Sequence, residues 1–200
     1  VGMKIQKLRT QSALLSTSVS GLWQGQGKQQ RVALKAQVAS PDLGKLLASM
    51  QYADMINRGE VNADIDIFWS GALTDFSLQT ISGVLDLNIK EGQILHVEPG
   101  GSGRVLGLFS LAEIPRRLSL DFSDFFGKGF AFKKMSGHFN FAHGKANTDN
   151  FLITAPAADI KVSGSTDYLT QQFNQVVEVY PKTSGVLPVI GALAAGPIGI

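Results

Sequence analysis

The chain of 200 residues contains no cysteine, so it forms no disulfide bond and offers no thiolate ligand to a metal. Charged residues make up only 17% of it, against roughly 25% in an average soluble domain. The net charge is +2, and no long run of lysine or arginine occurs. Because proteins that bind nucleic acids carry a basic stripe, the composition argues against that class.

Long hydrophobic runs are also missing. The stretch GVLPVIGALAAGPIGI at 185–200 is apolar and uncharged, but it has 16 residues and is interrupted by Pro188 and Pro197. A helix that spans a bilayer needs about 20 residues, so we expect no complete transmembrane segment. The first residues, VGMKI, are typical of the middle of a strand. We therefore expect the chain to be a fragment of a longer protein, with the apolar tail truncated.

The sequence lacks motifs for catalysis and for metal or cofactor binding. His96, His138 and His143 are scattered and form no H-x-H or H-E-x-x-H pattern. The glycine cluster PGGSGRVLG at 99–107 does not have the G-x-G-x-x-G spacing of a dinucleotide site. No serine lies in a nucleophile elbow. We therefore predict no catalytic residue, no metal and no cofactor.

One segment does combine charges with aromatic residues: PRRLSLDFSDFFGKG at 115–129. Arg116 and Arg117 fall at the end of a predicted helix, where cations complement the helix dipole. Asp121 and Asp124 can pair with them ahead of two glycines. A carboxylate used in catalysis would need a partner acid, base or nucleophile, and we find none. We interpret the four residues as a structural turn, with a hydrolase site as the alternative.

What the chain has in abundance is apolar/polar alternation with a period of two. Such alternation predicts antiparallel strands with one apolar and one wet face. It occurs at 61–69, 84–90, 138–142, 151–155, 159–164 and 173–179, separated by turn signals such as Glu91-Gly92, His143-Gly144 and Gly164-Ser165. The residues expected to share the apolar face are Ile65, Ile67, Trp69, Leu85, Leu87, Ile89, Phe139, Phe141, Phe151, Ile153, Ile160, Val162, Val177 and Val179.

Two segments break the alternation and predict helices. In SPDLGKLLASMQY at 40–52, Ser40 is the expected N-cap and Pro41 the first helical residue. The second, at 103–118, is largely apolar and ends near Pro115. We expect a first β unit at 1–98, a connecting helix at 99–118, a second antiparallel β unit at 119–184 and the tail at 185–200.

The predicted fold class is mainly β with a few helices: antiparallel meander sheets with helices at the ends or edges. Two arrangements of the apolar faces remain open. They can pack on each other as a closed β-sandwich, typical of an interaction or scaffold module. Alternatively, the sheets curl into an elongated open trough, or β-groove, whose apolar lining contacts lipid.

The stretch GLFSLAEIPRRLSLDFSDFFGKGFAF at 107–132 resembles the C-terminal region of YhdP-type proteins of the AsmA-like superfamily. Weaker matches follow in the expected order along nearly the whole chain, among them SPDLGKLLASM at 40–50, GVLDLNIKEGQI at 83–94, APAADIKVSG at 155–164 and VYPKTSGVLPVIGALAAGP at 179–197.

The resemblance implies a bridge-like lipid-transfer protein, anchored in the inner membrane of a Gram-negative bacterium and crossing the periplasm as a β-groove. The implied function is non-enzymatic movement of phospholipids between the inner and outer membranes, which supports outer-membrane integrity. The fourteen apolar-face residues would then line the groove. Phospholipid acyl chains, the bacterial membranes and an envelope protein are the implied partners. The C-terminal end would approach the outer membrane through a membrane-proximal tail that includes Leu187, Val189, Ile190 and Leu193.

Overall fold

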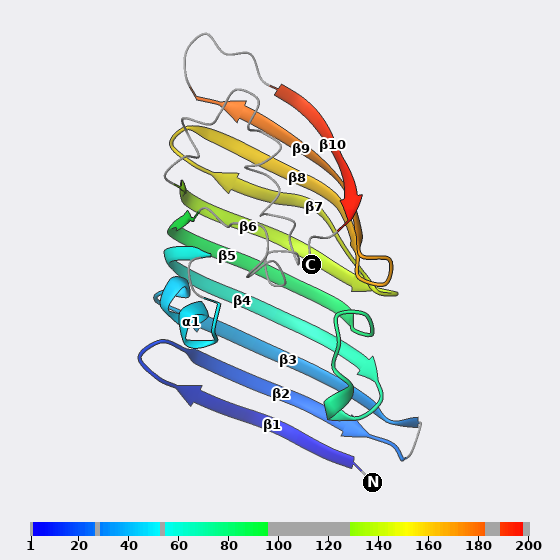
Figure 1. Ribbon diagram of the computed structural model, residues 1–200. Coiled ribbons are helices and arrows are strands. Elements are labelled where there is room, and N and C mark those ends of the chain that lie inside the picture. The colour runs from blue at the N-terminus through cyan, green and yellow to red at the C-terminus, as the bar shows by residue number, and fades with distance from the viewer. Residues whose placement is uncertain (1, 27–28, 53–54, 96–128, 183–188, 198–200) are drawn as a thin grey trace.

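The computed structural model describes residues 2–26, 29–52, 55–95, 129–182 and 189–197. Their strands form a single antiparallel sheet in which every strand pairs with its neighbour in sequence (Figure 1). The strands are β1 (Gly2–Gln11), β2 (Ser16–Gln24), β3 (Arg31–Ser40), β4 (Ile56–Ser70), β5 (Ser82–Ile94), β6 (Phe130–Ala142), β7 (Lys145–Thr154), β8 (Ala158–Asp167), β9 (Gln172–Pro181) and β10 (Val189–Pro197). The mainly β, meander fold predicted from the alternation is therefore confirmed.

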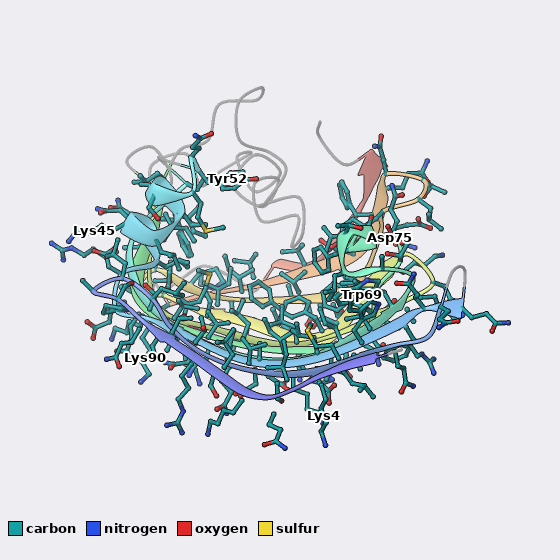
Figure 2. The ribbon with its side chains drawn as sticks, turned by 90° about the horizontal axis from the view of Figure 1, so that it is seen from below. Lys4, Lys45, Tyr52, Trp69, Asp75 and Lys90 are labelled. Carbon is teal, nitrogen blue, oxygen red and sulfur yellow. The ribbon has the colours of Figure 1, made fainter. Side chains whose placement is uncertain are left out.

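The sheet is open, because β1 and β10 lie at its two ends and do not pair with each other. Its strands also curve along their length, so that one face of the sheet is concave (Figure 2). Trp69 points into the concave side, whereas Lys4 and Lys90 point out from the convex side. We call the concave side the apolar face and the convex side the polar face. A β-sandwich needs two packed sheets, so the sandwich arrangement does not describe these residues.

Four ion pairs and one histidine–aspartate hydrogen bond link neighbouring strands on the polar face. Five pairs join residues that lie directly opposite each other in the register, and such cross-strand pairs stabilise a sheet by a few tenths of a kcal/mol to about 1 kcal/mol each. Eight of the ten side chains are at least 43% exposed, as expected for the wet face of an alternating sheet, whereas those of Asp167 and Glu178 are 17% and 25% exposed. The pairs are Lys35–Asp66, Lys90–Glu60, His138–Asp86, Lys145–Asp167 and Lys161–Glu178.

The first predicted helix is present, but its start was misassigned. Helix α1 spans Leu43–Ser49, and its N-cap is Asp42, whose carboxylate accepts a hydrogen bond from the Lys45 backbone N–H at 3.0 Å. Ser40 is instead the buried last residue of β3, and its hydroxyl accepts a hydrogen bond from the Asp42 N–H. Aspartate and serine are equally good caps, so the register of the chain leaving β3 decides between them.

The cap of α1 gives a pH-dependent prediction. The hydrogen bond from the Lys45 N–H lowers the pKa of Asp42 below its ordinary value of 3.8. A carboxylate whose pKa is lower in the folded state than in the unfolded state stabilises the fold at pH values above its unfolded-state pKa. This stabilisation is lost as the pH falls through the folded-state pKa. Asp42→Asn keeps the capping oxygen but removes the charge. We therefore expect the free energy of unfolding of the wild type to be about 0.3–1 kcal/mol higher than that of Asp42→Asn at pH 7. Urea unfolding at pH 7 and pH 3 should show this advantage disappear in acid; an advantage that grows in acid would contradict the assignment.

Two glycine signals that we interpreted as turns lie inside strands. Glu91 and Gly92 belong to β5, and Gly164 and Ser165 belong to β8. Gly164 has a φ of +127°, which a residue with a side chain rarely adopts, and Glu91 has a φ of +51°. Glycine supplies a left-handed conformation in a bent strand as readily as in a turn. The His143-Gly144 signal is confirmed as the β6–β7 turn, with φ values of +52° and +74°.

Several predictions fall on residues outside the described ranges. These are the helix at 103–118, the glycine cluster at 99–107 and the structural turn with Arg116, Arg117, Asp121 and Asp124. Within the tail, 189–197 forms β10 and pairs with β9. The division of the chain into two β units stays a prediction, although β5 and β6, one from each predicted unit, are neighbours in the sheet.

Candidate functional site

The apolar face consists of rows of side chains that run across the strands, along the length of the sheet. In one row the register aligns residues of six successive strands, β4 to β9, and every member is apolar and buried. The row is Val61, Ile89, Met135, Ile153, Ile160 and Val179. Side chains alternate between the two faces along each strand. The register of the six strands therefore places one apolar side chain of each strand beside that of the next, so that the row is continuous.

All fourteen residues predicted for the apolar face lie in one cluster. Eleven of them are buried, with exposed fractions of 7% or less, and most of these lie on β6 to β9. Three are only partly buried: Ile65, Leu85 and Leu87. The sequence therefore predicted which residues share the face, while the structure separates those whose surfaces are covered from those still accessible.

The accessible part forms a strip across β3, β4 and β5. We call it the half-open strip and define it as Leu34, Ile65, Leu85 and Leu87, all partly buried against the cluster. Ile65 lies directly opposite Leu85 in the register, and Leu34 lies opposite Ile67. A side chain that is fully surrounded by protein has no surface left for another molecule, so any apolar ligand of this face is expected to contact the half-open strip.

The apolar face becomes more exposed toward β1. Met3 and Leu8 of β1 are 43% and 51% exposed, and they lie opposite Trp23 and Val19 of β2. Trp23 is partly buried and donates its indole N–H to Gln30 at 2.9 Å. Exposed apolar side chains are common singly, but these continue the same face as the half-open strip.

Two margins rise on the concave side at opposite ends of the strands (Figures 1 and 2). One is α1, whose Leu43 and Leu47 pack against the apolar cluster. The other is the segment after β4, which contains the short 3₁₀ helix η2 (Leu73–Asp75). Trp69 fixes the start of that segment by donating its indole N–H to the Ala72 carbonyl at 2.8 Å. Trp69 itself is buried, at 4% exposed.

The second margin is tied to the β8–β9 turn. The Gln79 side chain donates to the Tyr168 carbonyl at 3.3 Å, and the Tyr168 N–H donates to the Gly144 carbonyl at 2.8 Å. Burial raises the pKa of Tyr168 well above its ordinary value, so its phenol stays neutral. These two hydrogen bonds thus link the β4–β5, β6–β7 and β8–β9 connections, which are far apart in the sequence.

The polar face holds a hollow of ≈ 460 Å³ lined by side chains of β1 to β5. Three of its carboxylates have protein partners: Lys35 pairs with Asp66 at 2.7 Å, Gln37 donates to Asp64 at 3.0 Å, and Asp86 is hydrogen-bonded to the His138 ring at 2.7 Å.

The described ranges contain neither a metal-binding cluster nor a membrane-spanning helix. There, no group of three or more histidine, aspartate or glutamate side chains is placed to hold a metal ion. No helix in this part of the chain has the length and hydropathy needed to cross a bilayer.

Comparison with known proteins decides the family. The family model described as "YhdP protein" matches residues 2–200. The chain belongs to the YhdP family. The resemblance predicted from the segment at 107–132 and its flanks is therefore confirmed.

Among curated proteins of this family, the chain is similar to the intermembrane phospholipid transporter YhdP of Escherichia coli (strain K12). The two are 26% identical over 181 residues, which is 90% of this chain and 14% of the relative. The chain thus spans about one seventh of the length of that relative. The relative is described as a transporter and not as an enzyme, in line with the predicted lack of catalysis. No solved structure is significantly similar to the chain.

Sequence reasoning missed part of the apolar face in β2 and β3. The segment RVALKAQVAS alternates Val32, Leu34, Ala36 and Val38 with polar residues, so the signal was present. In β2 the signal is weak, because Thr17 and Gly21 stand on the apolar face and Leu22 stands on the polar face. Met55 and Ile81 are also buried in the cluster although they lie outside strands, at positions that a period of two does not reveal.

Proposed function

We propose that this segment forms part of an apolar β-groove along which phospholipid acyl chains move between bacterial membranes, without catalysis. The observation that carries the proposal is the half-open strip, an apolar surface on the concave face of an open sheet that remains partly accessible. Membership of the YhdP family and the similarity to an intermembrane phospholipid transporter support the choice of lipid as the ligand.

An apolar surface is needed because exposing a lipid acyl chain to water costs free energy. Exposing each methylene to water costs about 0.8 kcal/mol, so a 16-carbon chain in bare solvent costs on the order of 13 kcal/mol. An apolar strip that contacts the tail removes much of that cost. Rows that run across the strands are suited to this role, because they extend along the sheet from one strand to the next.

The charged groups would remain on the other side of the wall. The cross-strand ion pairs lie on the polar face, so the charges of the sheet do not face the acyl chains. The phospholipid headgroup would travel at the margins formed by α1 and by the η2 segment. In this proposal the segment works in the periplasm, and the uncharged stretch at 185–200, with Leu187, Val189, Ile190 and Leu193, lies near the outer membrane.

Site-specific photocrosslinking tests the proposal. The full-length protein is expressed in a Gram-negative host with p-benzoyl-phenylalanine at Leu85, and cells grown in radioactive phosphate are irradiated. We expect a labelled lipid adduct at Leu85 and none at Asp86, the next residue, whose side chain lies on the polar face and is bonded to His138. Equal labelling at both positions, or none at Leu85 while the protein is folded, would contradict the proposal.

A further inference from the structure

A polar spot interrupts the apolar face on β7, β8 and β9. Thr166 and Gln175 are 2% and 5% exposed, and the Gln175 carboxamide donates to the Thr166 hydroxyl oxygen at 3.1 Å. The Thr148 hydroxyl is also buried, and it has no hydrogen-bond partner in the protein. Buried polar atoms without a partner are rare, so this oxygen requires an explanation.

The backbone around Thr148 departs from a regular ladder. The register of β7 shifts against β8 between Thr148 and Phe151, and against β6 between Asn147 and Leu152. Both shifts mark a β-bulge with one extra residue in β7. The Asn150 side chain compensates for the interruption by accepting the His138 N–H at 2.9 Å. Bulges re-aim nearby side chains and often occur beside functional sites.

A small cavity lies where these features meet. Its walls include Phe139, Phe151 and Val162, and its polar lining is Thr148, Thr166 and Gln175. Gly164, which also lines it, has no side chain to fill the space and lies directly opposite Thr148 in the register. About 10 Å³ is open to the centre of a water molecule, which is close to the room that one water needs.

The hydrogen-bonding capacity of the cavity suits one neutral oxygen atom. The Thr166 oxygen already accepts the Gln175 N–H, so its own proton is free to be donated. The Thr148 hydroxyl can donate as well. No described charged side chain lines the cavity, so neither an ion nor a charged headgroup would be compensated there.

We infer that Thr148, Thr166 and Gln175 form a binding site for a single uncharged oxygen atom within the apolar face. The oxygen can belong to a water molecule or to the ester carbonyl of a lipid. Only the second source rests on the proposed function. A carbonyl bound here would fix the position of the glycerol backbone of the lipid along the apolar face.

The deciding experiment is a crystal structure of the protein purified in detergent and stripped of lipid, at a resolution that shows ordered water. We expect a density peak within hydrogen-bond distance of Thr148 Oγ1 and of Thr166 or Gln175. Thr148→Val, which has the same shape but no hydroxyl, should lack the peak and unfold at lower urea concentration than Thr148→Ser. An empty cavity in the wild type, with Thr148→Val more stable than the wild type, would overturn the inference.

The source of the oxygen is resolved by adding back dioleoyl phosphatidylethanolamine or its diether analogue, which has no carbonyl. If a lipid carbonyl enters the site, ¹³C-carbonyl spectra of the ester lipid should shift on binding to the wild type and not to Thr148→Val, and the diether should bind more weakly. If water is the occupant, both lipids should leave the density peak in place. A protein that binds neither lipid would contradict the proposed function while the water peak still supports the site.

Discussion

Replacing Phe151 with alanine is expected to lower the free energy of unfolding by about 3–5 kcal/mol, the usual cost of deleting a buried aromatic ring. Phe151 is 1% exposed, and its ring centre lies 5.5 Å from that of Phe139. It also packs over Gly137, where even an added Cβ would come within 3.1 Å of it. Because native domains are stable by only about 5–15 kcal/mol, the loss would be a large part of the total.

The neighbouring residue provides the control for that measurement. Leu152 is 39% exposed on the polar face, so Leu152→Ala should change the stability by only about 0.5 kcal/mol. Urea titrations followed by tryptophan fluorescence would measure both variants. Equal effects of the two substitutions would show that the apolar face around β7 is not the packed part of the molecule.

The second large effect is expected on lipid binding. Leu87 belongs to the half-open strip, is only partly buried, and lies opposite Ala63 and Gly137 in the register. A charged residue in contact with hydrocarbon costs about 2.5–3.5 kcal/mol, which corresponds to roughly 100-fold weaker binding. We therefore expect Leu87→Glu to lose nearly all co-purifying phospholipid, as measured by native mass spectrometry or lipid extraction.

Two controls separate charge from shape and from surface position. Leu87→Gln has nearly the same shape as Leu87→Glu without the charge, so it should retain more lipid. Leu152→Glu places the same charge on the polar face and should retain lipid at the wild-type level. If Leu87→Glu is folded and keeps its full complement of phospholipid, acyl chains do not contact the half-open strip.

The predictions from sequence succeeded where a local pattern determines the structure. Alternation fixes which side chains share a face, and the fourteen predicted residues do lie in one cluster. The helix between β3 and β4 was recognised from the break in the alternation, but its N-cap was misassigned by two residues because Ser40 and Asp42 can both cap. The turns predicted at Glu91-Gly92 and Gly164-Ser165 were wrong, since a positive φ, here at Glu91 and Gly164, does not by itself reverse the chain.

By itself, then, the sequence determined a two-faced antiparallel meander with a low charge, and its resemblance determined the family. Only the tertiary structure decided that ten strands join one bent open sheet, that Phe151 is enclosed while Leu87 is partly accessible, and that a bulge in β7 leaves Thr148 beside a cavity. The physical reason is that a period of two specifies the direction of each side chain. What that side chain then meets depends on strand register and on contacts between residues far apart in the chain.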